Sequence, residues 1–279
     1  MKVKQVLGSN IISALDEGNE ILLMGKGIGF GVKPGNHVDE SKVSKVFSLK
    51  KQEINQFAEL VEKIPESHIR CAAEVISYAK VTLNKKLNDN IYLTLTDHLS
   101  YAVERKNQGI EFKNALLWEI KKFYHREYLI GLEALDIVKE RLGVELSADE
   151  AGYIALHIVN AELDTEMKQS IEITQVIQDL LNIVRYHFGI TIDEETLAYE
   201  RFITHLKFFI QRAVRKQSYE TGDMEFCNMI YRQYPDAHRC ALKMVTYMER
   251  KMNYDLTDEE IMYLTVHIKR IIQVNTESQ

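Results

Sequence analysis

Two stretches of this 279-residue sequence, LSADEAGYIALHI at 146–158 and LTDEEIMYLTVHI at 256–268, match each other. They lie 110 residues apart throughout, and Leu, Ser or Thr, Glu, Tyr, His and Ile recur in register. Each opens on a Ser/Thr-x-x-Glu capping box, which predicts the first turn of a helix. A duplication of this length indicates two homologous helical modules.

A second pair of matching positions lies upstream of the duplicated stretch. The tripeptide DHL at 97–99 corresponds to THL at 204–206, at an offset of 107. Seven residues beyond each histidine stands an arginine, Arg105 or Arg212, and seven residues are two helical turns along one face. Each module therefore has one histidine on an early helix and one on its last helix. The predicted modules are 55–169 and 170–279.

Apolar residues recur at helical spacing through most of the chain. From Ile54 they lie three and four positions apart until Pro65 stops the first run. Further amphipathic segments follow in each module, so the body of the protein is expected to be all α. The predicted helices are 54–64, 71–86, 89–106, 114–123, 128–142, 148–162, 173–186, 193–216, 224–234, 237–252 and 258–273.

The first 54 residues have the pattern of short strands. Apolar runs are separated by turn signals such as GSN at 8–10 and KPGN at 33–36. This spacing predicts a small four-stranded antiparallel meander. Such a module buries little core without a partner surface, so dimerisation through the sheet is expected. The predicted strands are 3–7, 11–15, 20–24 and 43–49.

The composition is that of a globular protein with 46% hydrophobic and 27% charged residues, which argues against disorder. No run approaches the 18 apolar residues of a membrane span, and no secretory signal is expected. Three scattered cysteines indicate neither disulfides nor a zinc site, so a cytoplasmic location is expected. The net charge is −6, yet residues 1–55 carry eight Lys, no Arg and six acids. A mildly basic head is compatible with binding nucleic acid.

Four of the nine histidines fall in the repeated pattern, and four interpretations are open for them. They are packing residues kept by duplication, metal ligands, acid–base catalysts or phosphoacceptors. Metal binding lacks a His-x-x-x-His or Glu-x-x-His pair, and catalysis lacks a nucleophile motif, so we expect neither a metal site nor an enzyme. The pattern favours phosphoacceptors, because a neutral imidazole attacks a phosphohistidine or phosphocysteine donor and the phosphate adds nearly two negative charges.

The densest feature of the head is GKGIGFG at 25–31, which holds four of the 13 glycines. It has neither G-K-S/T nor G-x-G-x-x-G, so no nucleotide-phosphate loop is predicted. Two interpretations remain open. One is a plain hairpin loop. The other is a backbone that presents Lys26 to phosphate and Phe30 to a base face, as RNA with unstacked bases requires, with the amide of Asn10 reading base edges.

Together these motifs resemble the BglG/SacY/LicT family of transcriptional antiterminators. The resemblance covers essentially the whole chain in the family's order. The stretches that carry it are MGKGIGF at 24–30, VSKVFSL at 43–49, LTDH at 95–98, NALLW at 114–118, DEAGYIALH at 149–157 and THLKF at 204–208.

The resemblance implies three domains: a co-antiterminator (CAT) RNA-binding domain at 1–54 and two PTS regulation domains at 55–169 and 170–279. The head would bind, as a homodimer, an mRNA hairpin that overlaps a terminator, so that transcription continues. The B domain of a sugar-specific enzyme II would phosphorylate the first regulation domain without sugar and inactivate the protein. The phosphocarrier HPr would phosphorylate the second and support activity. The similarity leans towards a β-glucoside system, and no cofactor is implied.

The family's functional positions transfer onto this sequence with four departures. GSN at 8–10 stands where Asn-Asn-Asn is common, and Gln5 where a basic residue is common. Lys26 stands where Arg also occurs, and Thr204 stands opposite Asp97. The phosphorylated positions are His98, His157, His205 and His267, with Asp97, Arg105 and Arg212 beside them, and the RNA-binding positions are Lys4, Gln5, Asn10, Gly25, Lys26, Gly27 and Phe30.

Two other classes of function are alternatives. A DNA-binding activator with the same regulation domains would need a helix-turn-helix head, whereas the head shows strand patterns. A helical enzyme would need a nucleophile or a metal site beside the histidines, and the sequence shows neither motif.

Overall fold

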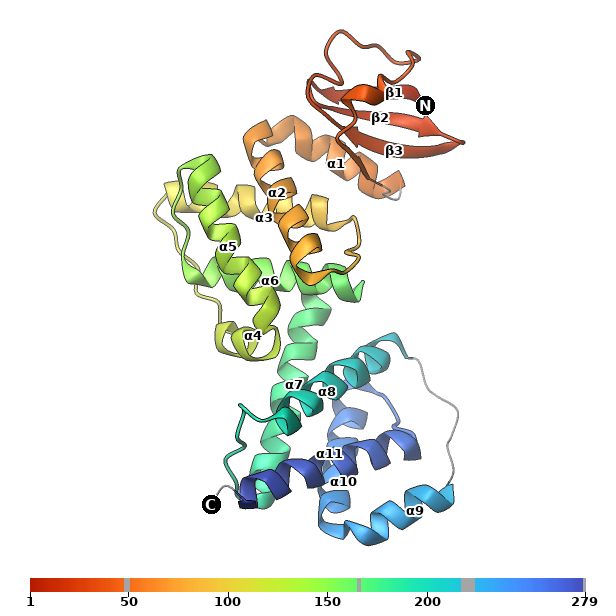
Figure 1. Ribbon diagram of the computed structural model, residues 1–279, viewed down its shortest axis with the longest axis vertical. Coiled ribbons are helices and arrows are strands. Elements are labelled where there is room, and N and C mark those ends of the chain that lie inside the picture. The colour runs from red at the N-terminus through yellow and green to blue at the C-terminus, as the bar shows by residue number, and fades with distance from the viewer. Residues whose placement is uncertain (48–50, 165–166, 217–223, 278–279) are drawn as a thin grey trace. The chain divides into compact units, whose positions relative to one another are not determined.

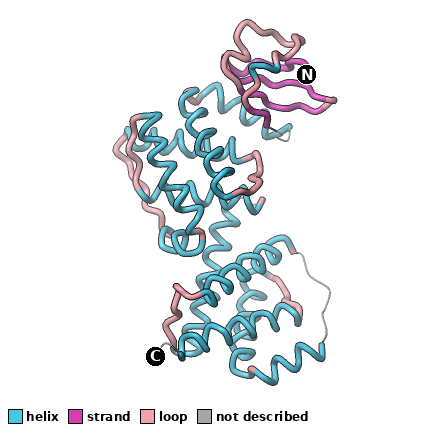
Figure 2. The backbone as a smooth tube through the Cα atoms, in the orientation of Figure 1, coloured by secondary structure: helices cyan, strands magenta, loops and turns pink. Residues whose placement is uncertain are grey.

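The computed structural model describes residues 1–47, 51–164, 167–216 and 224–277 (Figure 1). The chain forms two compact units, Met1–Met167 and Lys168–Gln279. The first unit combines a β-sheet with helices, and the described part of the second is helical (Figure 2). Among the described residues, no helix has the length and hydrophobicity needed to cross a membrane.

The head is an antiparallel sheet whose strands follow one another in chain order, which confirms the predicted meander. Glu17 and Gly18 have φ of 48° and 88°, as a two-residue hairpin between the second and third strands requires. The fourth strand is shorter than predicted, because a 3-10 turn at Glu40–Lys42 precedes it; predicted positions 48–49 lie outside the described residues. The strands are β1 (Lys2–Gly8), β2 (Ile11–Asp16), β3 (Asn19–Met24) and β4 (Lys45–Phe47).

In the described part of the first unit, helices α1 to α6 follow the sheet. Their bounds lie within three residues of the predicted ones, apart from α2, which begins at Glu66, directly after Pro65 and five residues before its predicted start. Helix α5 packs against α2 and α6, and α3 packs against α2 and α6. The helices are α1 (Lys51–Lys63), α2 (Glu66–Leu83), α3 (Ile91–Asn107), α4 (Leu117–Phe123), α5 (His125–Leu142) and α6 (Ala148–Leu163).

Both faces of the head sheet are buried. One face closes a small core of its own, with Ile12, Leu23 and Ile28 among its members. The other face joins the hydrophobic core of the helices, where the Phe47 ring lies 4.4 Å from the Tyr92 ring of α3, centroid to centroid. The chain's own helices therefore supply part of the partner surface that so small a sheet needs.

The second unit repeats the arrangement of the first. Helix α11 packs against α8, α9 and α10. The helix before each duplicated stretch ends in a left-handed residue at the same repeat position, Gly143 (φ 69°) and Asn253 (φ 49°). The repeat therefore holds in three dimensions. The helices are α7 (Met167–Phe188), α8 (Leu197–Arg215), α9 (Met224–Gln233), α10 (Pro235–Met252) and α11 (Asp258–Glu277).

Candidate functional site

Each helical module brings its two repeat histidines together. His98 on α3 faces His157 on α6, with ring centroids 4.9 Å apart. His205 on α8 faces His267 on α11, with ring centroids 4.3 Å apart. Residues about 60 positions apart in the sequence thus form one pair of imidazoles per module, and the pairs are equivalent under the repeat.

Within each pair, the histidine of the last helix is held neutral. Burial lowers the pKa of His157 well below its usual value, and a charge on His98 lowers it further. Burial lowers the pKa of His267 to about 4, with smaller contributions from His205, Arg270 and Arg201. A neutral imidazole keeps a nitrogen lone pair at pH 7, which nucleophilic attack on phosphorus requires.

In the first module, a buried glutamate links the histidine to the arginine two turns further along. Glu150 Oε1 accepts a hydrogen bond from Arg105 Nη2 at 2.8 Å, and Glu150 Oε2 lies 3.1 Å from His98 Nε2. The guanidinium of Arg105 also lies 4.2 Å from the Phe112 ring centroid. Burial raises the pKa of Glu150, but hydrogen bonding and charge from His98 and Arg105 outweigh it, so the net shift is downward.

Sequence reasoning missed the contact of Glu150 with His98, because it assigned this carboxylate to a capping box. That prediction is wrong for the first copy: the Ser147 side chain makes no capping hydrogen bond. The carboxylate that reaches His98 is also not the neighbouring Asp97, whose side chain is exposed. The signal that could have found Glu150 is its recurrence as Glu260 at the repeat offset.

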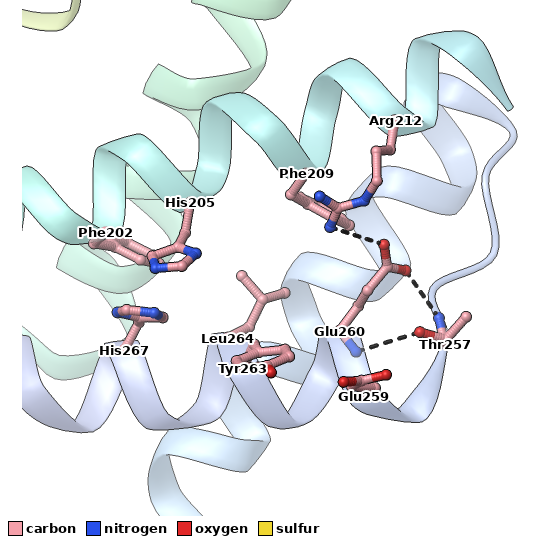
Figure 3. Close-up of a pocket in the computed structure, with 10 residues that line it drawn as sticks. All are labelled: Phe202, His205, Phe209, Arg212, Thr257, Glu259, Glu260, Tyr263, Leu264 and His267. Carbon is pink, nitrogen blue, oxygen red and sulfur yellow. Dashed lines mark hydrogen bonds and ion pairs between the residues drawn. The ribbon is translucent and has the colours of Figure 1, made fainter. Parts of the chain in front are cut away.

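The second module has a pocket of about 320 Å³ at the corresponding place (Figure 3). The facing imidazoles of His205 and His267 lie at one end, and the Arg212–Glu260 pair lies at the other, 3.2 Å between Nη2 and Oε1. Here the capping box forms as predicted: Thr257 N donates to Glu260 Oε2 at 3.1 Å, and Glu260 N donates to Thr257 Oγ1 at 3.3 Å. Unlike His267, His205 is exposed.

The glycine-rich loop of the head folds around the turn that joins β1 and β2. Gly25 N donates to Asn10 O at 2.9 Å, and Gly29 N donates to Ser9 O at 3.0 Å. A Cβ at Gly25 would lie 1.7 Å from the Lys42 carbonyl oxygen, so only glycine fits there. Phe30 is 81% exposed at the end of this loop. An exposed aromatic side chain in the same loop as an exposed lysine, Lys26, fits base stacking combined with a phosphate contact.

The predicted RNA-binding residues are not equally available. Gln5 and Lys26 are exposed, whereas Lys4 forms an ion pair with Glu20. The amide of Asn10 is engaged on both sides: its oxygen accepts from Gly27 N and its nitrogen donates to Glu66. The link from Asn10 to the first residue of α2 is absent from any local sequence pattern.

The comparisons with known proteins match this architecture. The CAT RNA binding domain family matches residues 1–56, and the PRD domain family matches 73–161 and 178–271. Transcription antiterminator LicT of Bacillus subtilis is 46% identical over 98% of this chain and 99% of its own length. The chain belongs to the BglG/SacY/LicT family of transcription antiterminators.

Two further relatives of this antiterminator family agree. The beta-glucoside operon antiterminator of Dickeya chrysanthemi is 40% identical over 97% of this chain and 96% of its own length. A crystal structure of GlcT CAT-PRDI aligns with a TM-score of 0.53 and 36% identity, and covers 58% of this chain and 97% of that one. Each PRD match includes one histidine pair, and the CAT match includes the sheet and its glycine-rich loop.

The structure of the head excludes one of the alternatives. Residues 1–47 form a sheet and one short 3-10 turn, so the helix-turn-helix head of a DNA-binding activator is excluded for these residues. Among the described residues, no group of three or more His, Cys, Asp or Glu side chains is placed to hold a metal ion. The relatives found are regulators of transcription, not enzymes.

Proposed function

We propose that this chain is a cytoplasmic, sugar-responsive antiterminator that binds an mRNA hairpin as a homodimer and prevents premature termination of a sugar-utilisation operon. The likeness to the beta-glucoside operon antiterminator supports a β-glucoside as the inducing sugar. The domains are 1–54 for RNA binding and 55–169 and 170–279 for regulation. The change of compact unit at Met167 supports the second boundary.

The observation that carries this proposal is the paired imidazoles. Two independent modules each hold two histidines from different helices with ring centroids within 5 Å, and burial lowers the pKa of the inner one. Duplication of a packing pair would also give the same pairing twice, so the match of both modules to the PRD family is the second support for the proposal. Enzyme II through its B domain, for the first module, and HPr, for the second, are the proposed phosphoryl donors.

Phosphate has different surroundings in the two modules. In the first, Arg105 is already paired with Glu150, so phosphate on His98 or His157 adds charge that this arginine does not neutralise. Like charges across a twofold interface repel, and the dimer opens. In the second, Arg201 and Arg270 act on His267 and are available to attract a phosphate there. Phosphate in the first module is therefore expected to oppose dimerisation, and phosphate in the second module to favour it.

A reporter gene placed behind the terminator, assayed in cells, tests whether the first histidine pair makes readthrough depend on the sugar. We expect the double variant His98→Ala, His157→Ala to read through the terminator without the sugar, because the inhibitory phosphate has no acceptor. His125→Ala, an exposed histidine outside the pairs, is the control and should still require the sugar. A double variant that remains sugar-dependent would refute the assignment of these histidines.

A gel-shift titration tests RNA binding by the protein. The full chain is used, because one face of the head sheet shares its core with the following helices. Selective binding to a family-type antiterminator hairpin is expected, with no shift of a scrambled hairpin at the same salt concentration. Equal binding to both RNAs would contradict sequence-selective recognition by the head.

A further inference from the structure

The duplicated glutamate has a different contact in each module. Glu260 contacts Arg212, the backbone of Thr257 and the hydroxyl of Tyr254, which lies 3.2 Å from Oε1. Glu150 contacts Arg105 in the same way, but its second oxygen faces the imidazole of His98. A position that serves as a cap in one module thus touches the candidate phosphoacceptor in the other.

One of the sequence differences between the two repeats bears directly on this contact. Tyr254 follows the left-handed Asn253, and the equivalent residue after Gly143 is Val144, which has no hydroxyl. Tyr254 hydrogen-bonds the Glu260 carboxylate, whereas valine leaves the Glu150 carboxylate without this donor. Glu150 is therefore available to His98.

We propose that Glu150 is a positioning residue for phosphorylation of His98: it accepts the Nε2 proton and so directs the phosphoryl group to Nδ1. This proposal rests on the proposed function, in which His98 is a phosphoacceptor. His98 Nε2 and Glu150 Oε2 are both buried and lie 3.1 Å apart, and among the described residues neither atom has a hydrogen-bond partner of standard geometry, so each is open to the other. A neutral histidine with its proton on Nε2 has its lone pair on Nδ1.

The same carboxylate stabilises the charge that develops during transfer. The Nδ1 lone pair forms the new N–P bond while the bond from phosphorus to the donor breaks, and the departing electron pair leaves with the donor. The ring becomes positively charged because its proton stays on Nε2. A carboxylate 3.1 Å away stabilises that imidazolium, as a buried carboxylate does for a catalytic histidine. Arg105 holds Glu150 in place from the other side.

The test uses the full chain and phosphoramidate, a small phosphoryl donor that needs no protein partner, alongside phosphorylated HPr and enzyme IIB. Long-range ¹H–¹⁵N NMR identifies the phosphorylated ring nitrogen, and comparison with His98→Ala assigns the signal. We expect wild-type phosphate on Nδ1. Glu150→Gln should slow His98 labelling about tenfold or more and distribute phosphate over both nitrogens, because the ring orientation and the charge stabilisation are lost.

A second variant keeps the buried glutamate and its arginine. Val144→Tyr introduces the hydroxyl found in the second module, and Val144→Phe adds the same ring without it. Val144 is partly exposed and packs against the hydrophobic core, so Val144→Phe controls for the effect of the larger ring on packing. We expect Val144→Tyr, and not Val144→Phe, to slow His98 labelling in the direction of Glu150→Gln. A purely structural role for Glu150 would leave the nitrogen unchanged in all these variants.

The outcomes separate the two proposals. Wild-type phosphate on Nε2, or full-rate labelling at Nδ1 only in both Glu150→Gln and Val144→Tyr, would overturn the role of Glu150 and leave His98 as an acceptor. No labelling of wild-type His98 by any of the donors would overturn both this inference and His98 as a phosphoacceptor.

Discussion

In the second module, the burial of a single residue determines which imidazole of the pair is accessible. His267 is 6% exposed, whereas its partner His205 lies in solvent. The proposed phosphoryl donor would reach the exposed ring first, and the buried ring stays neutral beside it. The asymmetry follows from position: the buried histidine is on the helix whose apolar face packs against three others.

His267 should make stability depend on pH. Its folded pKa of about 4 lies below the unfolded value of about 6.5, so the unfolded chain binds the proton first as pH falls. The contribution of His267 to the free energy of unfolding should be greatest at pH 7. It should decrease between about pH 6.5 and 4, by up to ~3 kcal/mol.

Urea unfolding at pH 7 and pH 5 measures this effect. His267→Gln should lose less stability between the two pH values than wild type does. The exposed His37→Gln is the control and should follow wild type. Equal losses in wild type and His267→Gln would show that another group is responsible.

Lys26 should contribute to RNA affinity through charge. Lys26→Ala removes an exposed cation from the glycine-rich loop, so the dissociation constant for the hairpin should rise about tenfold and the salt dependence should weaken by about one phosphate contact. Filter binding at several salt concentrations measures both quantities. Lys251→Ala, which removes an exposed lysine from α10, is the control and should leave both quantities unchanged. An equally large loss of affinity in Lys251→Ala would show that the net charge of the protein, and not the position of Lys26, determines the affinity.

Helices α6 and α11 differ in the capping of their N-terminal ends, although both begin with the same capping-box motif. Thr257 and Glu260 exchange hydrogen bonds at the start of α11, whereas at the start of α6 the Ser147 side chain makes no capping bond. A local motif offers a cap, and the tertiary contacts of the glutamate determine whether the cap forms.

Removing the cap hydroxyl should therefore have unequal effects. Thr257→Ala should lower the free energy of unfolding by about 1 kcal/mol, because the Glu260 N–H loses its partner. Ser147→Ala is the matched variant in the first module and should cost clearly less. Urea unfolding of both variants measures the difference, and equal costs would mean that Ser147 caps α6 in solution.

Within the whole first unit, Glu66 joins the head to the helices. Its carboxylate accepts hydrogen bonds from Ser9, at 3.2 Å, and from Asn10, and it pairs with Arg70. These hydrogen bonds lower the pKa of Glu66 against the opposing effect of burial, so the group is charged at pH 7. An RNA that uses the Asn10 amide must displace this carboxylate.

Glu66→Ala should strengthen RNA binding. Loss of one charged hydrogen-bond acceptor frees the Asn10 amide, and the hairpin affinity should rise about fivefold, the equivalent of ~1 kcal/mol. The gel-shift titration measures this rise. Glu59→Ala removes the same charge from an exposed position on α1 and should have little effect. Unchanged or weaker binding by Glu66→Ala would show that Asn10 needs Glu66 for its orientation.

Local patterns in the sequence were sufficient to predict the order and type of the secondary-structure elements. Helical and strand periodicities depend on neighbours within a few residues, and these gave the meander and the helices of both modules. The repeat itself indicated which histidines belong together, because equivalent positions of a duplicated fold have equivalent surroundings. The family resemblance supplied the RNA-binding and phosphoryl-transfer roles that periodicity cannot indicate.

Side-chain partners depended on the tertiary structure. Glu150 lies 45 residues from Arg105 in the sequence, and Glu66 lies 56 residues from Asn10. No local pattern encodes such contacts, because they form only when packing brings distant helices and strands to one place. The sequence by itself determined the elements and their duplication, and it indicated which histidines are candidates for phosphorylation. The tertiary structure alone decided which imidazole is buried and which carboxylate holds each reactive side chain, since burial and charge pairing belong to the packed molecule.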